Sequence, residues 1–117
     1  MRGLSEFNTV YLHRDPVDMR RSIDGLSAIV RNSMELTLDS PTLFVFLGRM
    51  KDRVKILYWD RTGYALWYKR LEKSSFPWPH KGEQIVSLTP QMLGWLLDGI
   101  DIFKIRPHNS VKLEQSW

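Results

Sequence analysis

The side chains that most often perform acid–base or metal chemistry are scattered along this sequence. Three aspartates lie close together near the N-terminus: Asp15, Asp18 and Asp24. The last two are six residues apart, so a helix would not present both carboxylates on one face, and we interpret all three as capping or solvated residues. Three histidines lie far apart and lack the spacing of zinc ligands: His13, His80 and His108. We therefore predict no metal site and no acid–base pair.

Motifs for nucleophilic catalysis and for cofactor binding are also missing from the sequence. Ser74, Ser75 and Ser87 are not surrounded by the pattern of a nucleophile elbow. Gly48 and Gly63 do not belong to a glycine-rich loop that could hold phosphate groups. The chain has no cysteine, which removes disulfides, thiolate metal ligands and thiol nucleophiles. We predict that the protein is not an enzyme and has no catalytic residue and no cofactor.

The basic residues favour a different chemistry, the binding of nucleic acid. The net charge of the chain is +4 and its pI is near 9.6. Residues 49–73 contain three acids and a cluster of basic residues: Arg49, Lys51, Arg53, Lys55, Arg61, Lys69, Arg70 and Lys73. Lysine and arginine that neutralise phosphates release condensed counterions, which gives affinity without sequence preference. These residues are therefore candidate DNA contacts, and Arg20 and Arg21 are candidates to extend the set.

Aromatic side chains are interleaved with these cations: Tyr58, Trp59, Tyr64, Trp67 and Tyr68. Aromatic rings can stack on exposed bases. In the alternative interpretation the rings belong to the core and the cations form a solvated rim, and spacing alone does not decide between the two. For a protein-interaction module without DNA binding, the candidate docking side chains are Trp59, Trp67 and Trp78.

Hydropathy patterns predict the elements that must position these residues. Residues 10–13 are expected to form a short strand, which the Asp15–Pro16 step should end. Four apolar residues then follow at helical spacing: Met19, Ile23, Leu26 and Val30. They predict a helix over about 17–32, with Asp15 or Asp18 as its N-cap.

Three strands are predicted in the middle of the chain. Residues 43–47 are all apolar, which is typical of a central strand that is covered on both faces. Residues 54–59 and 64–71 flank the turn signal Asp60–Gly63, in which Gly63 is expected at the position that tolerates positive φ. A bulge at Gly63 and a two-residue turn would give opposite cross-strand pairings, and the sequence leaves this register open.

The C-terminal part adds a loop, a strand and a helix. Phe76–Pro79 is expected to be a loop over an apolar surface, and residues 85–86 a short strand. Thr89 and Pro90 should start a helix that ends near 98, with Gly99 as its stop signal. The element order predicts an α+β fold, a mostly antiparallel sheet with two main helices packed on it. The predicted core consists of Leu43–Leu47, Ile23, Leu26, Leu93 and Leu96.

The length of 117 residues predicts one domain over 1–117, with an irregular tail at 103–117. No apolar run approaches about 18 residues, so no membrane span is expected. The first ten residues are too polar for a secretory signal peptide. Together with the absence of cysteine, this makes the cytoplasm the expected location.

Several blocks of the sequence resemble a known family. The blocks are VDMRRSIDGL (17–26), LFVFLGR (43–49), DRVKILYWD (52–60), YKRLE (68–72), FPWP (76–79), VSLTP (86–90) and LLDGID (96–101). Over about residues 10–102 they resemble, in order and separation, the accessory protein encoded by the second open reading frame of the insertion sequence 66 family of bacterial transposons. That family usually has more arginine where this chain has Leu47 and Met50, and the tail beyond Phe103 matches no pattern.

The resemblance implies a part in transposition beside a separate, larger transposase that carries the catalytic acids. The leading hypothesis is a non-catalytic accessory factor that binds DNA through the basic hairpin within residues 49–73, binds the transposase, or does both. The alternative is an interaction module that docks on the transposase or on another copy of itself without binding DNA. The expected partners are thus DNA, with weak and salt-dependent affinity, and the transposase, with self-association as an open alternative.

Overall fold

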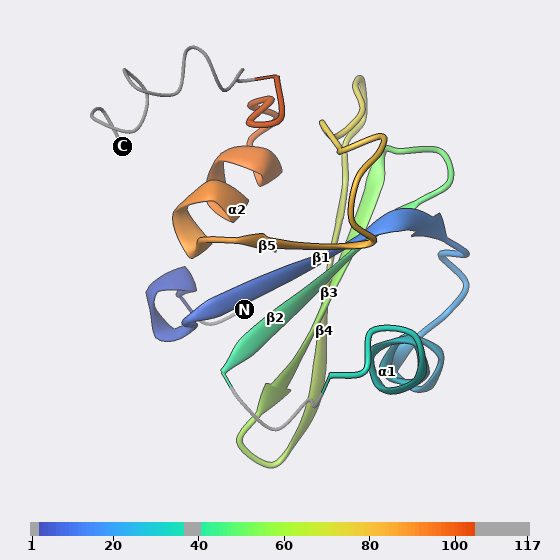
Figure 1. Cartoon of the computed structure of the whole chain (residues 1–117), viewed down its shortest axis with the longest axis vertical. Coiled ribbons are helices and arrows are strands. Elements are labelled where there is room, and N and C mark those ends of the chain that lie inside the picture. The colour runs from blue at the N-terminus through green and yellow to red at the C-terminus, as the bar shows by residue number, and fades with distance from the viewer. Residues whose placement is uncertain (1–2, 37–40, 105–117) are drawn as a thin grey trace.

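The computed structural model describes residues 3–36 and 41–104 of the chain (Figure 1). Its elements are the short 3-10 helix η1 (Leu4–Glu6), β1 (Thr9–Val17), α1 (Ile23–Asn32), β2 (Thr42–Gly48), β3 (Arg53–Asp60), β4 (Gly63–Arg70), β5 (Ile85–Leu88) and α2 (Pro90–Leu97). The strands form a five-stranded sheet in the order β4-β3-β2-β1-β5. The predicted tail lies mostly in residues 105–117, which are outside the described residues.

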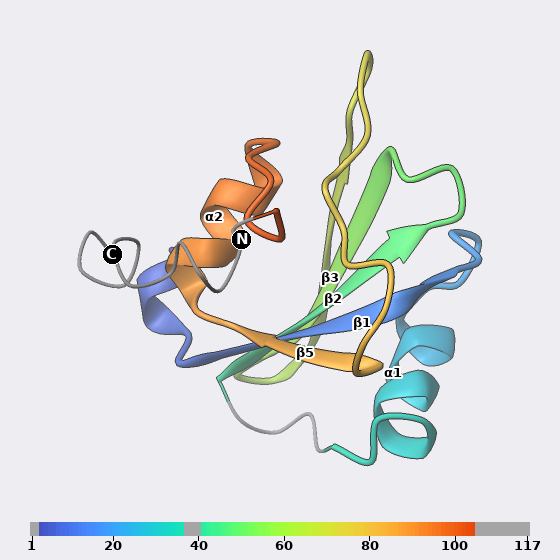
Figure 2. The same cartoon turned by 45° about the horizontal axis from the view of Figure 1, so that its top comes forward.

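The pairing of the strands confirms the predicted α+β fold with a mostly antiparallel sheet. β2–β3, β3–β4 and β1–β5 are antiparallel pairs, whereas β1 and β2 are parallel neighbours. A parallel pair needs a crossover connection, and α1 lies in that connection. The two main helices lie on opposite faces of the sheet (Figure 2).

The first strand is longer than predicted. β1 continues through Asp15 and Pro16 to Val17, so the expectation that this step ends the strand is wrong. The register against β2 shifts between His13 and Val17. Proline lacks the N–H that a regular ladder needs, and such an irregularity is where a strand tolerates it.

The first helix is shorter than predicted. α1 begins at Ile23 after the N-cap Ser22, and neither Asp15 nor Asp18 caps it. Met19 precedes the helix but packs against the same apolar cluster as Leu26. Ile23 was expected in the core but is only half-buried at the first helical position, whereas Leu26 is fully buried.

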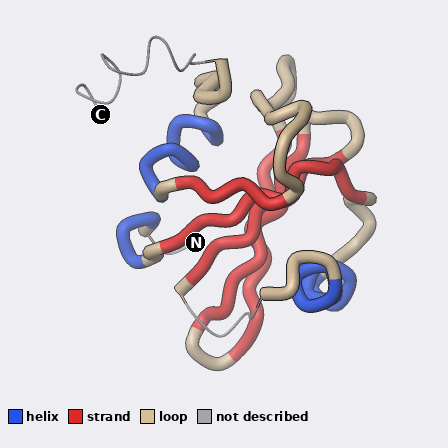
Figure 3. Tube along the Cα trace, in the orientation of Figure 1, coloured by secondary structure: helices blue, strands red, loops and turns tan. Residues whose placement is uncertain are grey.

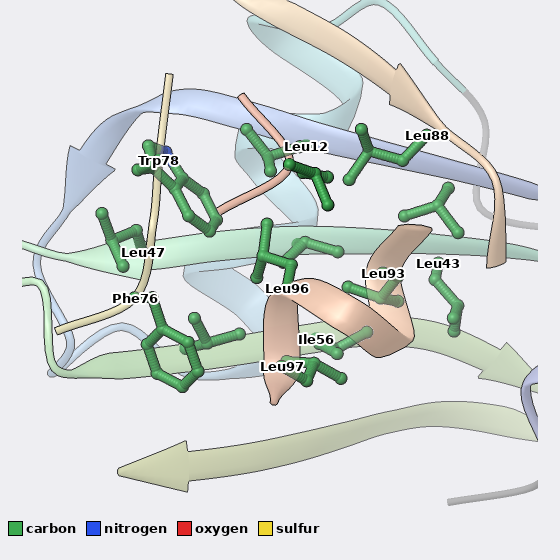
Figure 4. Packing of buried hydrophobic residues seen from close by; sticks show 14 of the residues in the cluster. Leu12, Leu43, Leu47, Ile56, Phe76, Trp78, Leu88, Leu93, Leu96 and Leu97 are labelled. Carbon is green, nitrogen blue, oxygen red and sulfur yellow. The ribbon is translucent and has the colours of Figure 1, made fainter. Parts of the chain in front are cut away.

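The central strand is buried along its whole length, as predicted, because each face is covered by a different element. On one face, α2 and the segment around Phe76 and Trp78 cover Leu43, Val45 and Leu47 (Figure 4). On the other face, α1 covers Phe44 and Phe46. The predicted core at Leu26, Leu93 and Leu96 is also confirmed.

The β3–β4 hairpin resolves the open register in favour of a two-residue turn. Asp60 pairs with Gly63, and Trp59 pairs with Tyr64. The positive φ in the turn, 58°, belongs to Arg61 and not to Gly63, so the expected role of this glycine is wrong. Residues directly opposite in an antiparallel pair share a face, so this register decides which face each cation joins.

The segment after the hairpin forms as expected. A long irregular stretch, tan in Figure 3, connects β4 to β5 and includes the Phe76–Pro79 loop. Thr89 caps α2, since its hydroxyl accepts a hydrogen bond from the Met92 N–H at 3.1 Å. Gly99 has a φ of +88°, which suits a glycine after a helix end.

Candidate nucleic-acid interface

The eight cations of residues 49–73 do not share one surface. The register places Arg53, Lys55 and Arg70 on the sheet face that α1 covers, because they lie an even number of residues along β3 or β4 from Leu57 and Leu66, which pack in the cluster under α1. Lys69 pairs with Val54 and therefore belongs to the opposite face. The remaining four lie in turns and loops: Arg49, Lys51, Arg61 and Lys73. The sequence segment is thus divided by its own fold into groups with different surroundings.

Lys55 and Lys69 are committed to hydrogen bonds inside the molecule. The Lys55 ammonium donates to the carbonyl oxygens of Met19 and Arg21, at 2.7 and 2.8 Å. The Lys69 ammonium donates to the Leu97 carbonyl oxygen at 2.9 Å, at the C-terminus of α2. A cation at this end of a helix also interacts favourably with the helix dipole. Both lysines therefore hold the connections of the covering helices and are poorly placed to meet phosphates.

Most of the other cations converge on one end of the sheet, where β1, β2 and β4 end and β3 begins. Val17 is paired with Gly48, and Arg53 is paired with Arg70. We call this region the basic sheet end; it consists of Arg20, Arg21, Arg49, Lys51, Arg53, Arg70 and Lys73. Arg61 lies at the other end of the hairpin.

Backbone contacts hold the segments of the basic sheet end together. The Leu71 N–H donates to the Asp52 backbone carbonyl oxygen at 2.8 Å, and the Phe76 N–H donates to the Lys51 backbone carbonyl oxygen at 2.8 Å. A Cβ on Gly48 would lie 2.5 Å from Cγ of Met19, so glycine allows the β1–α1 connection to pack directly on the end of β2. The arrangement of these cations therefore follows from the fold of four neighbouring segments.

Three acids partly neutralise the basic sheet end. Arg20 pairs with Asp18 at 2.6 Å, and Arg70 pairs with Glu72 at 3.1 Å. A looser pair links Arg53 to Asp52 at 3.7 Å. The four remaining cations form no ion pair among residues 3–36 and 41–104: Arg21, Arg49, Lys51 and Lys73. All four are exposed, so their charge is available to a ligand.

Asp18 is held in its charged form mainly by Arg20 and to a smaller extent by Arg49. Hydrogen bonds from the Arg20 side chain and the Arg20 backbone N–H hold the pKa of the Asp18 carboxyl well below its usual range. The charge of Arg49 lowers this pKa further. Asp18 and Arg49, together with Arg53, line a notch of about 140 Å³ in the basic sheet end. The lowered pKa of Asp18 thus reflects chiefly its hydrogen bonds with Arg20, with a smaller contribution from the positive charge of Arg49.

The candidate aromatic residues differ in how far they are accessible. Trp78 is only 5% exposed and its indole N–H donates to the Arg14 carbonyl oxygen at 2.9 Å, so it belongs to the core. Trp67 is half-buried and packs against the apolar cluster under α2. Trp59 is half-buried beside Tyr64, with their ring centroids 5.0 Å apart. Trp59 is thus the candidate that lies nearest to an exposed aromatic surface.

Two exposed tyrosines were absent from the candidate docking aromatics. Tyr64 is 38% exposed and Tyr68 is 48% exposed, both on β4 at the edge of the sheet. Their alternation along a strand was visible in the sequence, but the edge position of that strand was not. The exposed rings lie along β4, separate from most of the exposed cations.

Residues 3–36 and 41–104 contain neither a cluster of metal-ligating side chains nor a membrane-spanning helix. Within that part of the chain, no group of three His, Cys, Asp or Glu side chains could hold a metal ion. Among the helices described, none has the length and apolar character needed to cross a membrane.

The molecule is thus a small α+β protein in which one end of the sheet is basic. Lys55 and Lys69, on the strands of the sheet, form hydrogen bonds with the segments of the two helices that cover it. The sequence model of the family described as IS66 Orf2 like protein matches residues 8–107, and the chain belongs to this family. The match confirms the resemblance found in the sequence blocks. Family membership associates the chain with transposition of an insertion sequence.

The names of two similar proteins describe no activity. The chain is 29% identical to the uncharacterized protein y4jC of Sinorhizobium fredii over 106 residues, covering 91% of each chain. It is 33% identical to the uncharacterized protein y4hO of the same organism over 92 residues, covering 79% of this chain and 80% of the relative. No solved structure matches the chain significantly.

Proposed function

We propose that this protein is a non-catalytic accessory factor in the transposition of an insertion sequence, and that it contacts the DNA backbone through the basic sheet end. The observation that carries the proposal is the convergence of cations from four segments onto one end of the sheet. Four of them are exposed and have no acidic partner within the described residues: Arg21, Arg49, Lys51 and Lys73. Cations in this state can release counterions from phosphates without first breaking an ion pair.

The expected binding mode is contact with phosphates without readout of bases. α1 and α2 both use their apolar faces to cover the sheet, and the basic sheet end is built from turns and strand ends. Sequence is read mainly by elements that enter a groove, whereas contacts to phosphates only position a protein on the duplex. Recognition of the ends of the element would then come from the transposase, which remains a proposed partner.

The proposal is tested by fluorescence anisotropy of short duplexes, with and without transposon-end sequences, over a series of salt concentrations. If four phosphates are neutralised, log K should fall against log salt with a slope of about −3.6, at about −0.9 per contact. The variant with Arg21, Arg49, Lys51 and Lys73 all changed to Gln should lose most of this slope. Because these side chains are exposed, its thermal unfolding should be close to that of the wild type.

The matched control removes the same number of exposed cations elsewhere: Arg31, Arg61, Lys81 and Lys104, all changed to Gln. It should retain most of the salt slope, since only the net charge and not the basic sheet end is altered. Equal loss in both variants would show that binding depends on net charge alone and would contradict the proposed interface. A wild-type protein that binds no duplex at low salt would contradict DNA contact altogether and favour docking on the transposase.

A further inference from the structure

The two edges of the sheet differ in length and in how they are used. β5 has four residues, and the chain around it is tied to β1, since the Arg14 N–H donates to the Gln84 carbonyl oxygen at 2.8 Å. β4 has eight residues and, among the described strands, pairs only with β3. A long edge strand presents a row of unpaired N–H and C=O groups and is a template for pairing with another strand. β4 therefore has the properties of an interaction surface.

The hairpin register determines which backbone groups of β4 point outward. Asp60 and Gly63 pair at the close of the two-residue turn, so the backbone N–H and C=O of Gly63 point towards β3. The Leu71 N–H also points towards β3, since it donates to the Asp52 carbonyl oxygen. Backbone groups of an edge strand alternate between the two sides, so the residues between these positions point away from β3. The outward-facing residues are Tyr64, Leu66, Tyr68 and Arg70.

We propose that β4 pairs with β4 of a second copy of this chain, antiparallel and about a two-fold axis at Trp67. In this register Tyr64 lies opposite Arg70 of the second copy, and Leu66 lies opposite Tyr68 of the second copy. Each such pair exchanges two hydrogen bonds, so all outward groups of β4 are satisfied on both copies. A slip of two residues in one direction would place Arg70 against the partner's turn, and a slip in the other direction would place Tyr64 beyond the partner strand; either slip would leave part of the row unpaired.

The charges of β4 favour an antiparallel second copy over a parallel arrangement. One end of the strand is basic, with Lys69 and Arg70, and the other end carries the aromatic pair of Trp59 and Tyr64. Antiparallel pairing separates the basic ends and places each Arg70 guanidinium beside the partner's aromatic pair, where a cation is attracted by the ring faces. It also brings Glu72 of one copy near Arg61 of the other, which adds opposite charges.

The pairing would unite both sheets into one continuous sheet, with the two basic sheet ends pointing in opposite directions along the strands. The two copies of Arg70 would be offset by six residues, or roughly 20 Å along the strand direction. This separation exceeds the Debye length at physiological salt, so the repulsion between the two ends is screened. The pairing itself does not depend on DNA contact; a dimer with two phosphate-binding ends rests on the proposed function as well.

Sedimentation of the full chain over a range of concentrations tests the pairing. The wild type should shift from a 13.8 kDa monomer towards twice that mass as the concentration rises. Tyr68→Pro removes an N–H that points outward while the inward ladder to β3 is kept, so the dimer Kd should rise about tenfold or more. Tyr68→Ala keeps this N–H and is the matched control, which should dimerise more tightly than the proline variant.

A wild type that stays monomeric at every concentration would overturn the proposal, as would equal association of the proline variant and the wild type. Far-ultraviolet circular dichroism and a melting curve establish that both variants remain folded. If Tyr68→Pro does not fold, the pairing is tested by cross-linking, which leaves the strand backbone unchanged.

Cross-linking is clean in this protein because the chain has no cysteine. In the proposed register Ala65 of one copy lies opposite Lys69 of the other, as a non-hydrogen-bonded pair whose Cα atoms should be about 4.5 Å apart, close enough for a disulfide. A mixture of the Ala65→Cys and Lys69→Cys chains should form a mixed disulfide dimer under mild oxidation, and neither chain alone should do so efficiently. Absence of the mixed dimer, or equally rapid linkage of Ala65→Cys to itself, would overturn the proposed register.

Discussion

Lys55 and Lys69 on one side, and Arg49 and Lys51 on the other, come from the same short stretch of sequence but have opposite surroundings. The first two lie on strands, and their ammonium groups bind carbonyl oxygens at the ends of other elements. The other two lie in the β2–β3 turn, are exposed and form no ion pair among the described residues. We call them the inner and the outer cations.

The difference shows that the number of charges in a sequence segment does not tell how many of them lie on one exposed surface. A side chain in a strand must project to one face of the sheet, and both faces here are covered by helices. A lysine in that position lays its aliphatic stem along apolar surface and brings its charge to a polar atom at the rim. The exposed side chains of Arg49 and Lys51 lie in a turn, where neither face of the sheet determines their direction. The inner cations should therefore matter for stability and the outer cations for ligand binding.

The largest effect is expected in the core beneath the inner cations. Leu96→Ala on the α2 side and Leu26→Ala on the α1 side should each lower the free energy of unfolding by about 2–5 kcal/mol, because both side chains are fully buried. Urea denaturation measures this loss. Changes close to zero in the free energy of unfolding of both variants would contradict the assignment of these residues to the core. They would also contradict the view that the hairpin strands mainly stabilise the fold.

Substitution of an inner and an outer cation sharpens the comparison directly. Lys55→Gln loses two charge-assisted hydrogen bonds to the carbonyl oxygens of Met19 and Arg21, and should cost about 1–3 kcal/mol of stability. Lys51→Gln makes the same change in charge at an exposed turn and should stay within about 0.5 kcal/mol of the wild type. Urea midpoints of the two variants, compared at equal salt, should thus differ clearly; equal midpoints would break the distinction.

A smaller effect is expected from the acid that belongs to the outer region. The pKa of Asp18 is lowered in the folded protein, so its ion pair with Arg20 stabilises the fold above the ordinary aspartate pKa and is lost as the pH falls through the lowered value. The wild type should therefore lose slightly more stability than Asp18→Asn between about pH 5 and about pH 2. Urea midpoints across this range measure the difference, and identical profiles would contradict the pairing in solution.

The same Asp18→Asn variant should bind duplex DNA more tightly at low salt near neutral pH. It removes a negative charge from the basic sheet end and releases Arg20, whose side chain is 90% exposed. The magnitude of the salt slope should rise by up to about 0.9, the value for one additional phosphate contact. Unchanged or weaker binding would argue that the basic sheet end does not act as a phosphate-binding group.

Local signals in the sequence predicted a large part of the fold. The apolar run at 43–47, the turn after Asp60 and the Thr89–Pro90 helix start all depend on interactions within a few residues, and all are present. The strand through Pro16 and the late start of α1 at Ile23 were not predictable in the same way. In both cases, contacts with β2 and with the sheet end outweigh the preference of the local sequence.

The amino-acid sequence by itself determined the family, the α+β class and the excess of positive charge in residues 49–73, because these depend on composition and on patterns of nearby residues. Only the tertiary structure decided which cations are exposed. The hairpin register turned Lys55 and Lys69 towards carbonyl oxygens of distant segments, and it buried Trp67 in part. The sheet order brought Arg21 and Arg49 to one end and left β4 at an edge. Register and strand order depend on contacts between residues far apart in the chain, and a one-residue slip would exchange every face.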